Sequence, residues 1–290
     1  MDISALFVQL LNGLQAGLVL FLVASGLTLL FGIVGIINLA HGAFFMLGAY
    51  LCWWLVGLTD SLALALVVGT TIMAASGMVL EKVVFRPLQG RDHLDQVIVT
   101  FGLILVIDDL QKTLFGSDFR SVPIPEALNG SIALSDVQSY PVYRLFVALM
   151  AIVLAIGLAV LIKQSRLGML MRAGATRPEM LSALGTDLGR LMGIVVALGA
   201  GLAAFAGMIQ APVSSVYPGM GDQVLILSFV VVVLGGTGSL KGAFWAALLV
   251  GLADTFGKVF FPDLASLGIY ALMAAILAWR PQGLFGKAPA

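Results

Sequence analysis

Three groups of residues carry side chains that could do chemistry. The first is the run from Gly235 to Lys241 (GGTGSLK), which superficially resembles a loop that holds nucleotide phosphates. It lacks a glycine directly before the lysine and a serine or threonine directly after it, so the nucleotide-binding pattern fails. We therefore expect this chain not to hydrolyse ATP. Its small residues favour close helix packing instead, as do two other glycine series. Those series are Gly13-xxx-Gly17 and Gly185-xxx-Gly189-xxx-Gly193.

His41 is the second candidate, because histidine can move protons or bind a metal. No other His, Cys or carboxylate stands at ligand spacing from it, so we predict no metal site and no cofactor. Asn38 and Gly42 beside it indicate the start of a helix at the cytoplasmic side, where His41 would hydrogen-bond backbone groups. A structural role and a gating role both stay open. No nucleophile–base pair is found either, so the sequence gives no support to a membrane enzyme.

Polar side chains within apolar segments form the third group, because burying them in lipid is costly and marks them as functional candidates. We predict that six of them line a polar path: Asn12, Gln15, Ser25, Thr28, Asn38 and His41. Asn12 and Gln15 share one helix face. Asp108 and Asp109 come late in another apolar segment. They indicate either a water-filled vestibule or a membrane span that ends sooner than residue 116.

The elements that must position these residues are membrane helices. Of the 290 residues, 60% are hydrophobic and 10% are charged, whereas soluble domains are about a quarter charged. The mean hydropathy is +1.08.

The 15 basic and 15 acidic side chains balance, so no net charge favours nucleic acid. Cys52 is the single cysteine and is expected to be a small buried hydrophobe. The first basic residue is Lys82, so the start lacks the charge of a cleaved signal peptide.

The fold class that follows is an all-α, polytopic membrane protein in which residues 1–290 form one domain. A membrane helix needs about 20 mostly apolar residues. Nine runs fit: 6–31, 38–56, 62–82, 96–116, 142–162, 191–211, 223–238, 242–260 and 264–280. Two of them, 38–56 and 223–238, are short and lie beside glycine-rich stretches. Either could be broken or re-entrant, so we expect eight to nine crossings.

Orientation follows from the basic residues, which concentrate on the cytoplasmic side. If the N-terminus is outside and nine segments cross, the outer ends and loops hold only Lys112, Arg120, Arg144 and Lys258. The inner segments hold the rest: Lys82, Arg86, Arg91, Lys163, Arg166, Arg172, Arg177, Arg190, Lys241, Arg280 and Lys287. The C-terminus is therefore predicted inside, and the tail with Asp2 is easily translocated.

Two loops are long. The outer loop, 117–141, is rich in Pro, Asn and Gly, so an irregular surface with little helix is expected. The inner loop, 163–190, contains a segment, 176–185, with its own start and stop signals. Thr176 fits an N-cap with Glu179 completing a capping box, Pro178 suits the first turn, and Gly185 suits the end. Physical reasoning leaves two roles open for this helix: an interfacial anchor, or a coupling helix that docks into a cytoplasmic partner.

Four motifs, in order along the chain, resemble one family. The segment Asn38 to Tyr50 (NLAHGAFFMLGAY) is similar to the N-L-A-H-G-x-(F/L)-x-M-x-G-A-Y segment of LivH-type permeases. Arg172-Ala173, Ala183 to Gly185 and the small-residue run Gly199 to Gly207 resemble that family's cytoplasmic loop and following helix. The late motifs are Gly235 to Ala243 and the closing Arg280 to Gly286 (RPQGLFG). The likeness runs from about Leu10 to Gly286.

The resemblance implies one membrane half of a binding-protein-dependent ABC importer, working by alternating access. Its partners would be a related permease subunit, two cytoplasmic ATPase subunits, a periplasmic binding protein and the lipid of the bacterial inner membrane. Substrates would be branched-chain amino acids, or in close relatives other amino acids, amides or urea. The ATPase-coupling residues would be Thr176, Glu179, Met180, Leu181, Ala183, Leu184 and Gly185. A stand-alone secondary transporter or channel is the alternative, but it would leave the 176–185 helix without a role.

The charge distribution gives a testable topology. In a Cys52-free background, a cysteine at Ser131 should react with an impermeant thiol reagent from outside, and one at Pro289 only from inside. Labelling of both positions from the same side would contradict the orientation.

Overall fold

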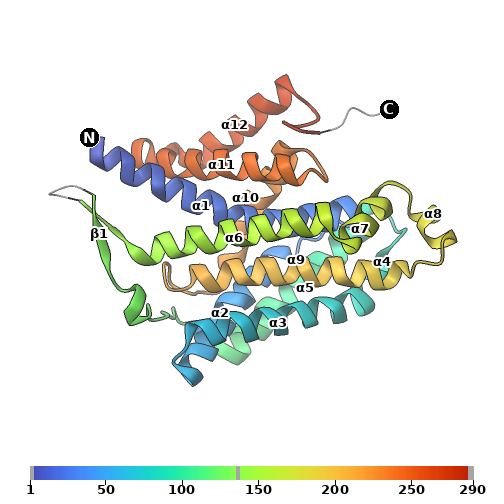
Figure 1. Cartoon of the computed structure of the whole chain (residues 1–290), viewed down its shortest axis with the longest axis horizontal. Helices are drawn as coiled ribbons and strands as arrows, with labels where there is room; N and C mark the ends of the chain where they lie inside the picture. The colour runs from blue at the N-terminus through green and yellow to red at the C-terminus, as the bar shows by residue number, and fades with distance from the viewer. Residues whose placement is uncertain (1–2, 135–137, 287–290) are drawn as a thin grey trace.

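The computed structural model describes residues 3–134 and 138–286, so the expectations for Asp2, Lys287 and Pro289 lie outside the described residues. The long helices lie roughly side by side, with a small hairpin at one end of the molecule and two short helices at the other (Figure 1). Ser131, the outer labelling position, is exposed in that hairpin.

The helices occupy most of the chain. They are α1 (Ile3–Leu29) with the π-helix η1 (Leu30–Val34), α2 (His41–Thr59), α3 (Leu62–Leu80) with the π-helix η2 (Glu81–Phe85) and α4 (Arg86–Leu88), α5 (His93–Phe115), α6 (Val142–Gln164), α7 (Arg166–Thr176), α8 (Pro178–Ala183), α9 (Leu188–Gln210), α10 (Met220–Gly235), α11 (Leu240–Phe260) and α12 (Ala265–Trp279). Short 3-10 turns lie at η3 (Glu126–Leu128) and η4 (Pro262–Leu264).

A helix is present at each of the nine predicted segments, but the expected eight to nine crossings are not confirmed. Within the described residues, six helices are long and apolar enough to cross a membrane: 4–34, 41–59, 62–88, 142–164, 188–210 and 240–260. The helices α10 and α12 have only 16 and 15 residues. The 23-residue α5 is long enough, but Asp95, Asp108, Asp109 and Lys112 interrupt its apolar sequence.

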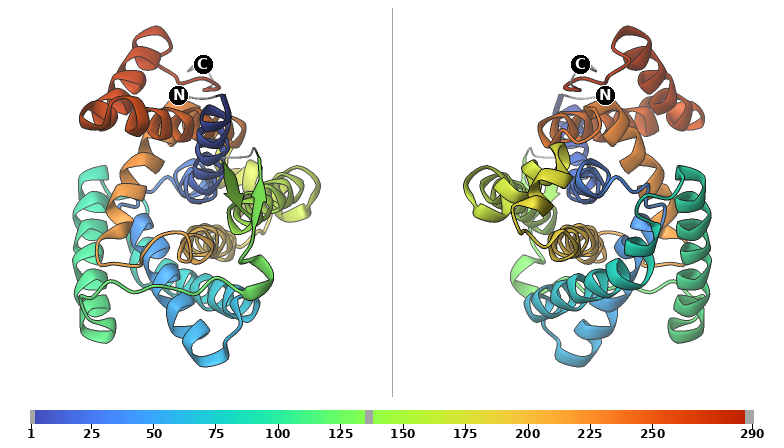
Figure 2. Two further views of the ribbon diagram at one scale, coloured as in Figure 1. Left: turned by 90° about the vertical axis from the view of Figure 1, so that its left-hand side faces the viewer. Right: turned by 90° about the vertical axis from the view of Figure 1, so that its right-hand side faces the viewer.

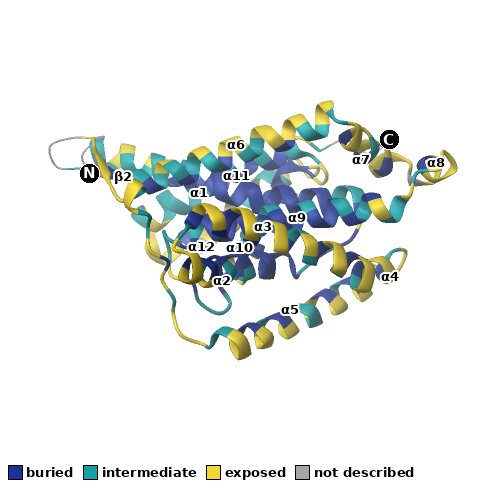
Figure 3. Ribbon diagram, turned by 60° about the horizontal axis from the view of Figure 1, so that its bottom comes forward, coloured by how far each residue is buried: buried dark blue, intermediate teal, exposed yellow. Residues whose placement is uncertain are grey.

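The core forms around α9, which packs against α1, α2 and α3 and is buried along most of its length (Figures 2 and 3). Glycines allow this close approach. A Cβ at Gly48 would overlap the carbonyl oxygen of Ala204, and one at Gly207 would overlap that of Phe45. Small residues at a helix contact let two backbones come together and maximise dispersion contacts, which is the main source of helix association in lipid. Cys52 is buried, as expected.

Two of the predicted glycine series do pack helices. Gly13 and Gly17 of α1 lie against the backbone of α11 around Gly251. Gly242 lies against Gly235, where α11 meets α10. The third series is wrong at Gly185, which is not in a helix contact: it has a φ of +80° and no neighbouring atom within reach of a Cβ.

The two late signature motifs meet in space. The N–H of Leu284 donates to the carbonyl of Leu234 at 2.7 Å, and that of Phe285 to the carbonyl of Gly235 at 3.2 Å. Gly236 and Gly283 both have positive φ, and a Cβ on Gly283 would lie 2.6 Å from the nitrogen of Gly236. The glycines of both motifs are therefore explained by one tight backbone contact at the end of α10.

The outer loop contains more order than expected. Strands β1 (Ser131–Ala133) and β2 (Ser139–Pro141) form an antiparallel hairpin, with Ser131 opposite Pro141. Arg120 pairs with Val216 through backbone hydrogen bonds, and its guanidinium carbon lies 4.9 Å from the ring centre of Trp53. The hairpin is a small departure from an all-α fold.

Replacing Gly48 by Ala tests the packing around α9. The added methyl group would force α2 away from the backbone of Ala204, and overpacking of this kind costs about 1–3 kcal/mol. We expect a lower thermal unfolding midpoint in detergent. The matched control is Gly157→Ala in α6, where a Cβ meets no atom within 4 Å. An equal effect of the two substitutions would contradict the packing role.

Candidate functional site: an interrupted helix pair and a short exposed helix

The helical path is interrupted between α1 and α2. Gly35, with a φ of +71°, ends the π-helix η1, and residues 35–40 are not helical before α2 begins at His41. The Nε2 atom of His41 lies 3.0 Å from the carbonyl oxygen of Val23. Val23 precedes the end of η1 by eleven residues, about 16 Å along a helix axis. The predicted helix start at His41 is confirmed, and it lies inside the bundle, where His41 is fully buried.

Side chains of α5 support the interrupted segment. The N–H of Ile37 donates to Oε1 of Gln96 at 3.2 Å, and the hydroxyl of Thr100 is 3.4 Å from the carbonyl oxygen of Ile37. Asn38 Oδ1 accepts from the N–H of Ala40 at 3.0 Å. Irregular backbone is tolerated at membrane depth only where the protein satisfies its polar groups. Sequence reasoning missed Gln96 and Thr100, although two polar residues four apart on a mostly apolar helix were a usable signal.

Three buried polar atoms near the start of α2 and on the adjoining α10 have no hydrogen-bond partner in the described part of the chain. They are Nδ2 of Asn38, Nδ1 of His41 and Oγ of Ser228, and all three residues are fully buried. Gly42 packs against Gly221 at the start of α10, and Ser228 follows on the same helix face about two turns later. Buried polar atoms are rarely left unpaired, so these three are candidates to bind a passing polar group.

The other predicted path residues have partners elsewhere. Asn12 accepts a hydrogen bond from Arg144 of α6 at 2.5 Å. Gln15 donates to Gln210 of α9 at 3.3 Å. The hydroxyls of Ser25 and Thr28 donate to carbonyls of their own helix, at Leu22 and Ala24. Of the six residues, only Asn38 and His41 therefore have a buried polar atom without a partner in the described part of the chain.

The aspartate pair lies within α5, which continues to Phe115. The helix itself extends past the pair, and α5 is not among the six described helices that are long and apolar enough to cross a membrane. Asp109 is exposed, and Asp108 is half-buried within electrostatic range of Asp222 at the start of α10.

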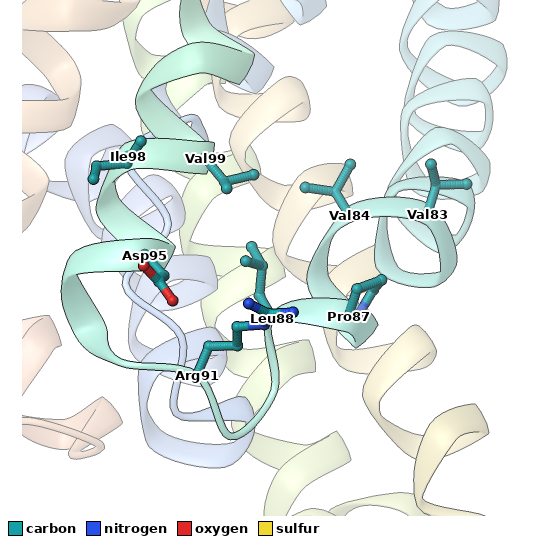
Figure 4. A pocket seen from close by; sticks show the side chains of 8 residues that line it. All are labelled: Val83, Val84, Pro87, Leu88, Arg91, Asp95, Ile98 and Val99. Carbon is teal, nitrogen blue, oxygen red and sulfur yellow. The ribbon is translucent and has the colours of Figure 1, made fainter.

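A cavity of about 440 Å³ separates the start of α5 from η2 and α4 (Figure 4). Its walls are mostly apolar, with Val84 opposite Val99, and Arg91 and Asp95 lie near the turn that connects the two sides. The face of α5 that supports the interrupted segment therefore differs from the face that lines this cavity.

The predicted cap of the inner-loop helix is wrong. Thr176 is the last residue of α7, and its hydroxyl donates to the carbonyl of Arg172 at 2.9 Å, one turn back. Arg177 stands at the N-cap position of α8 and makes no side-chain cap hydrogen bond. The capping box with Glu179 does not form, because Thr176 remains within the preceding helix. The helix is shorter than predicted, six residues from Pro178 to Ala183.

The predicted end of that helix is confirmed. The N–H of Gly185 donates to the carbonyl of Ser182 at 2.9 Å, and that of Thr186 to the carbonyl of Leu181 at 3.2 Å. These two bonds form a Schellman motif, which needs the left-handed conformation that Gly185 adopts.

The helix α8 has one buried face and one exposed face. Leu181 is only 6% exposed and lies beside Gly174 of α7, so it belongs to the core and not to the docking face where it was expected. Met180 and Leu184 are 55% and 79% exposed. Glu179 and Ala183 are exposed with them. The helix thus presents two apolar side chains, a carboxylate and a small residue at the tip of the molecule (Figure 1).

An ion pair between η2 and α4 lies beside the start of α9, with Glu81 buried and Arg86 half-exposed. Glu81 is 1% exposed and accepts two hydrogen bonds from Arg86, at 3.1 and 2.9 Å. Gly189 and Gly193, in the first turns of α9, lie beside Arg86 and Glu81. A bidentate pair of this geometry is strong, and loss of Arg86 would leave the buried carboxylate of Glu81 unpaired. Sequence reasoning missed it, because the pair lies in a π-helical turn.

Among the described residues, no three His, Cys, Asp or Glu side chains gather in a way that could hold a metal ion. The apolar helices, the interrupted segment with its unpaired polar atoms, and the exposed α8 define a multi-pass membrane protein of the permease class.

Comparisons with known proteins agree. The family described as "Branched-chain amino acid transport system / permease component" matches residues 9–277, so the chain belongs to that family. The chain is 32% identical to the high-affinity branched-chain amino acid transport system permease protein BraD of Pseudomonas aeruginosa, over 96% of this chain and 95% of BraD. It is 28% identical to the LivH permease protein of Salmonella typhimurium, over the same shares. The LivM permease protein of that organism is 25% identical, over 92% of this chain and 68% of LivM. No solved structure matches.

Replacing Gln96 by Leu tests the support of the interrupted segment. The substitution leaves the part-buried N–H of Ile37 without its side-chain acceptor, and a typical hydrogen bond contributes about 1 kcal/mol to stability. We expect the thermal unfolding midpoint to fall. Gln164→Leu, at the exposed end of α6, is the control and should have little effect. If both variants unfold at the wild-type temperature, Gln96 does not stabilise the break.

Proposed function

We propose that the whole chain is one permease domain of a binding-protein-dependent ABC importer, and that it forms the membrane path for branched-chain amino acids. The observation that carries this proposal is the family match over residues 9–277, together with near full-length similarity to relatives named as branched-chain amino acid permeases. The chain itself hydrolyses no ATP, since its one phosphate-loop-like segment forms the tight contact at the end of α10.

The path runs past the interrupted segment. Asn38, His41 and Ser228 offer three buried polar atoms with no partner in the described residues, and apolar side chains of α2 and α10 surround them. An aliphatic zwitterion needs few polar contacts in passing, because a separate binding protein provides the affinity. Asn12, Gln15, Ser25 and Thr28 are engaged elsewhere, so we assign them a smaller part.

The partners follow from the same class. The similarity to both a LivH and a LivM protein supports pairing with a second, related permease subunit. Two ATPase subunits would bind the end of the molecule that carries α8, and a periplasmic binding protein would bind the hairpin end. This arrangement places the N-terminus outside and the C-terminus in the cytoplasm of the bacterium.

We assign ATPase coupling to the exposed face of α8, made of Glu179, Met180, Ala183 and Leu184. These side chains lie at the tip of the molecule, where no other described element covers them. Leu181 and the turn at Gly185 act differently: they attach the helix to α7 and α9, so that a displacement of α8 is passed to the bundle. Thr176 contributes as the end of α7 and not as a cap.

Reconstitution with a substrate panel tests the function directly. With its partner subunits, ATP and the binding protein, the importer should accumulate leucine, isoleucine and valine in proteoliposomes. Uptake of urea or short amides instead of these three amino acids would contradict the proposed substrate. Uptake by this chain alone, driven by an ion gradient, would contradict the proposed class.

Substitutions on α8 test the coupling role. Glu179→Lys and Ala183→Trp should abolish substrate-stimulated ATPase activity of the reconstituted complex, because they place a reversed charge and a bulky group on the docking face. Thr176→Ala removes no cap and should leave stimulation near the wild-type level. Glu126→Lys, in η3 at the other end, controls for the charge reversal. Wild-type stimulation in both docking-face variants would make α8 a membrane anchor only.

A further inference from the structure

A groove on the outer surface of the bundle has features that the transport function does not use. It has a volume of about 520 Å³ and lies between α6 and α11, with Phe21 of α1 among its lining residues. The helix α1 is visible between α6 and α11 in Figure 1. Most of its lining is apolar, from Ile152, Ile156 and Ala159 of α6 and Phe244 and Trp245 of α11.

One end of this groove is basic. Lys163 at the end of α6, Arg172 of α7 and Lys241 at the start of α11 all line it, and all three are exposed. No acidic residue lines the groove, and none of the three cations forms a salt bridge within the described residues. Arg172 donates to the carbonyl of Ile162, which holds its guanidinium at the junction of α6 and α7. The first turn of α11, capped by Ser239, adds the positive end of a 21-residue helix.

The groove has the length of one lipid leaflet. Ile152 and Lys163 are eleven residues apart on α6, about 16 Å along the axis. A hydrocarbon core is about 30 Å thick, so the apolar part of the groove matches one acyl layer, with the cations at headgroup level. Trp245, 56% exposed and one turn after Lys241, lies where interfacial tryptophans gather.

We propose that this groove binds one anionic phospholipid, with its phosphate among Lys163, Arg172 and Lys241 and an acyl chain along α6 and α11. Basic pockets between membrane helices are a recognised way to hold anionic headgroups. A phosphate in this position contacts the end of α6, α7 and the start of α11 together. It therefore fixes the junction from which α7 leads to α8.

Quenching of Trp245 fluorescence tests the proposal on the full-length chain. A variant with Trp53, Trp54 and Trp279 replaced by Phe keeps Trp245 as its single tryptophan. In phosphatidylcholine vesicles, phosphatidylglycerol with brominated acyl chains should quench Trp245 more strongly than brominated phosphatidylcholine at the same mole fraction. Equal quenching by the two brominated lipids would overturn the proposal.

Two variants separate charge from shape. Lys163→Gln with Lys241→Gln should weaken the preference for the anionic lipid by about fivefold for each cation removed. Arg172 is kept, because it also bonds Ile162. The matched control, Lys82→Gln with Arg166→Gln, removes two exposed cations that do not line the groove and should keep the preference. Ala159→Phe fills the acyl part and should reduce quenching while all three cations remain.

A free anion is the competing occupant. Inorganic phosphate should not displace the brominated lipid if the acyl chain contributes to binding. Displacement by phosphate at millimolar concentration, with no effect of Ala159→Phe, would identify an anion site and overturn the lipid assignment. An equal loss of preference in the control pair would show that only surface charge attracts the lipid.

Discussion

The structure depends on one constraint: a backbone N–H or C=O at membrane depth must find its partner within the protein. Residues 35–40 are not helical, so their polar groups rely partly on side chains brought from elsewhere. Gln96 and Thr100 of α5 serve Ile37, and His41 reaches the carbonyl of Val23. The placement of α5 and the entry of α2 between α1, α9 and α10 follow from this requirement. The same break leaves Asn38 Nδ2 and His41 Nδ1 buried without a hydrogen-bond partner among the described residues.

Glycine makes this arrangement possible in a second way. The start of α2 touches α10 at Gly42 and Gly221, and its middle touches α9 at Gly48 and Gly207. At each contact a Cβ would collide with the opposite backbone, so the helices approach more closely than larger side chains permit. Close approach therefore fixes α2 directly after the non-helical residues 35–40. These four glycines therefore position the interrupted helix.

The sequence predicted the helices well, because apolar runs and glycine stops are local signals. It placed the helix start at His41 and the turn at Gly185, both of which depend on a few neighbouring residues. It failed where a second element decides the outcome. Thr176 has the right type and spacing for a cap, yet it stays in α7. Leu181 was placed on the docking face, but it packs against α7. The partners of residues 35–40 lie some 60 positions away on α5, beyond the reach of any local pattern.

The central claim is that the interrupted segment lies on the substrate path. Asn38→Cys in a Cys52→Ala background, assembled with its partner subunits in proteoliposomes, tests it most directly. A small hydrophilic thiol reagent should modify this cysteine only while the importer hydrolyses ATP, and modification should stop leucine uptake. Ala204→Cys, buried in the contact between α2 and α9, should stay unmodified under the same conditions. Full modification of Asn38→Cys with unchanged uptake, or no modification in any state, would contradict the account.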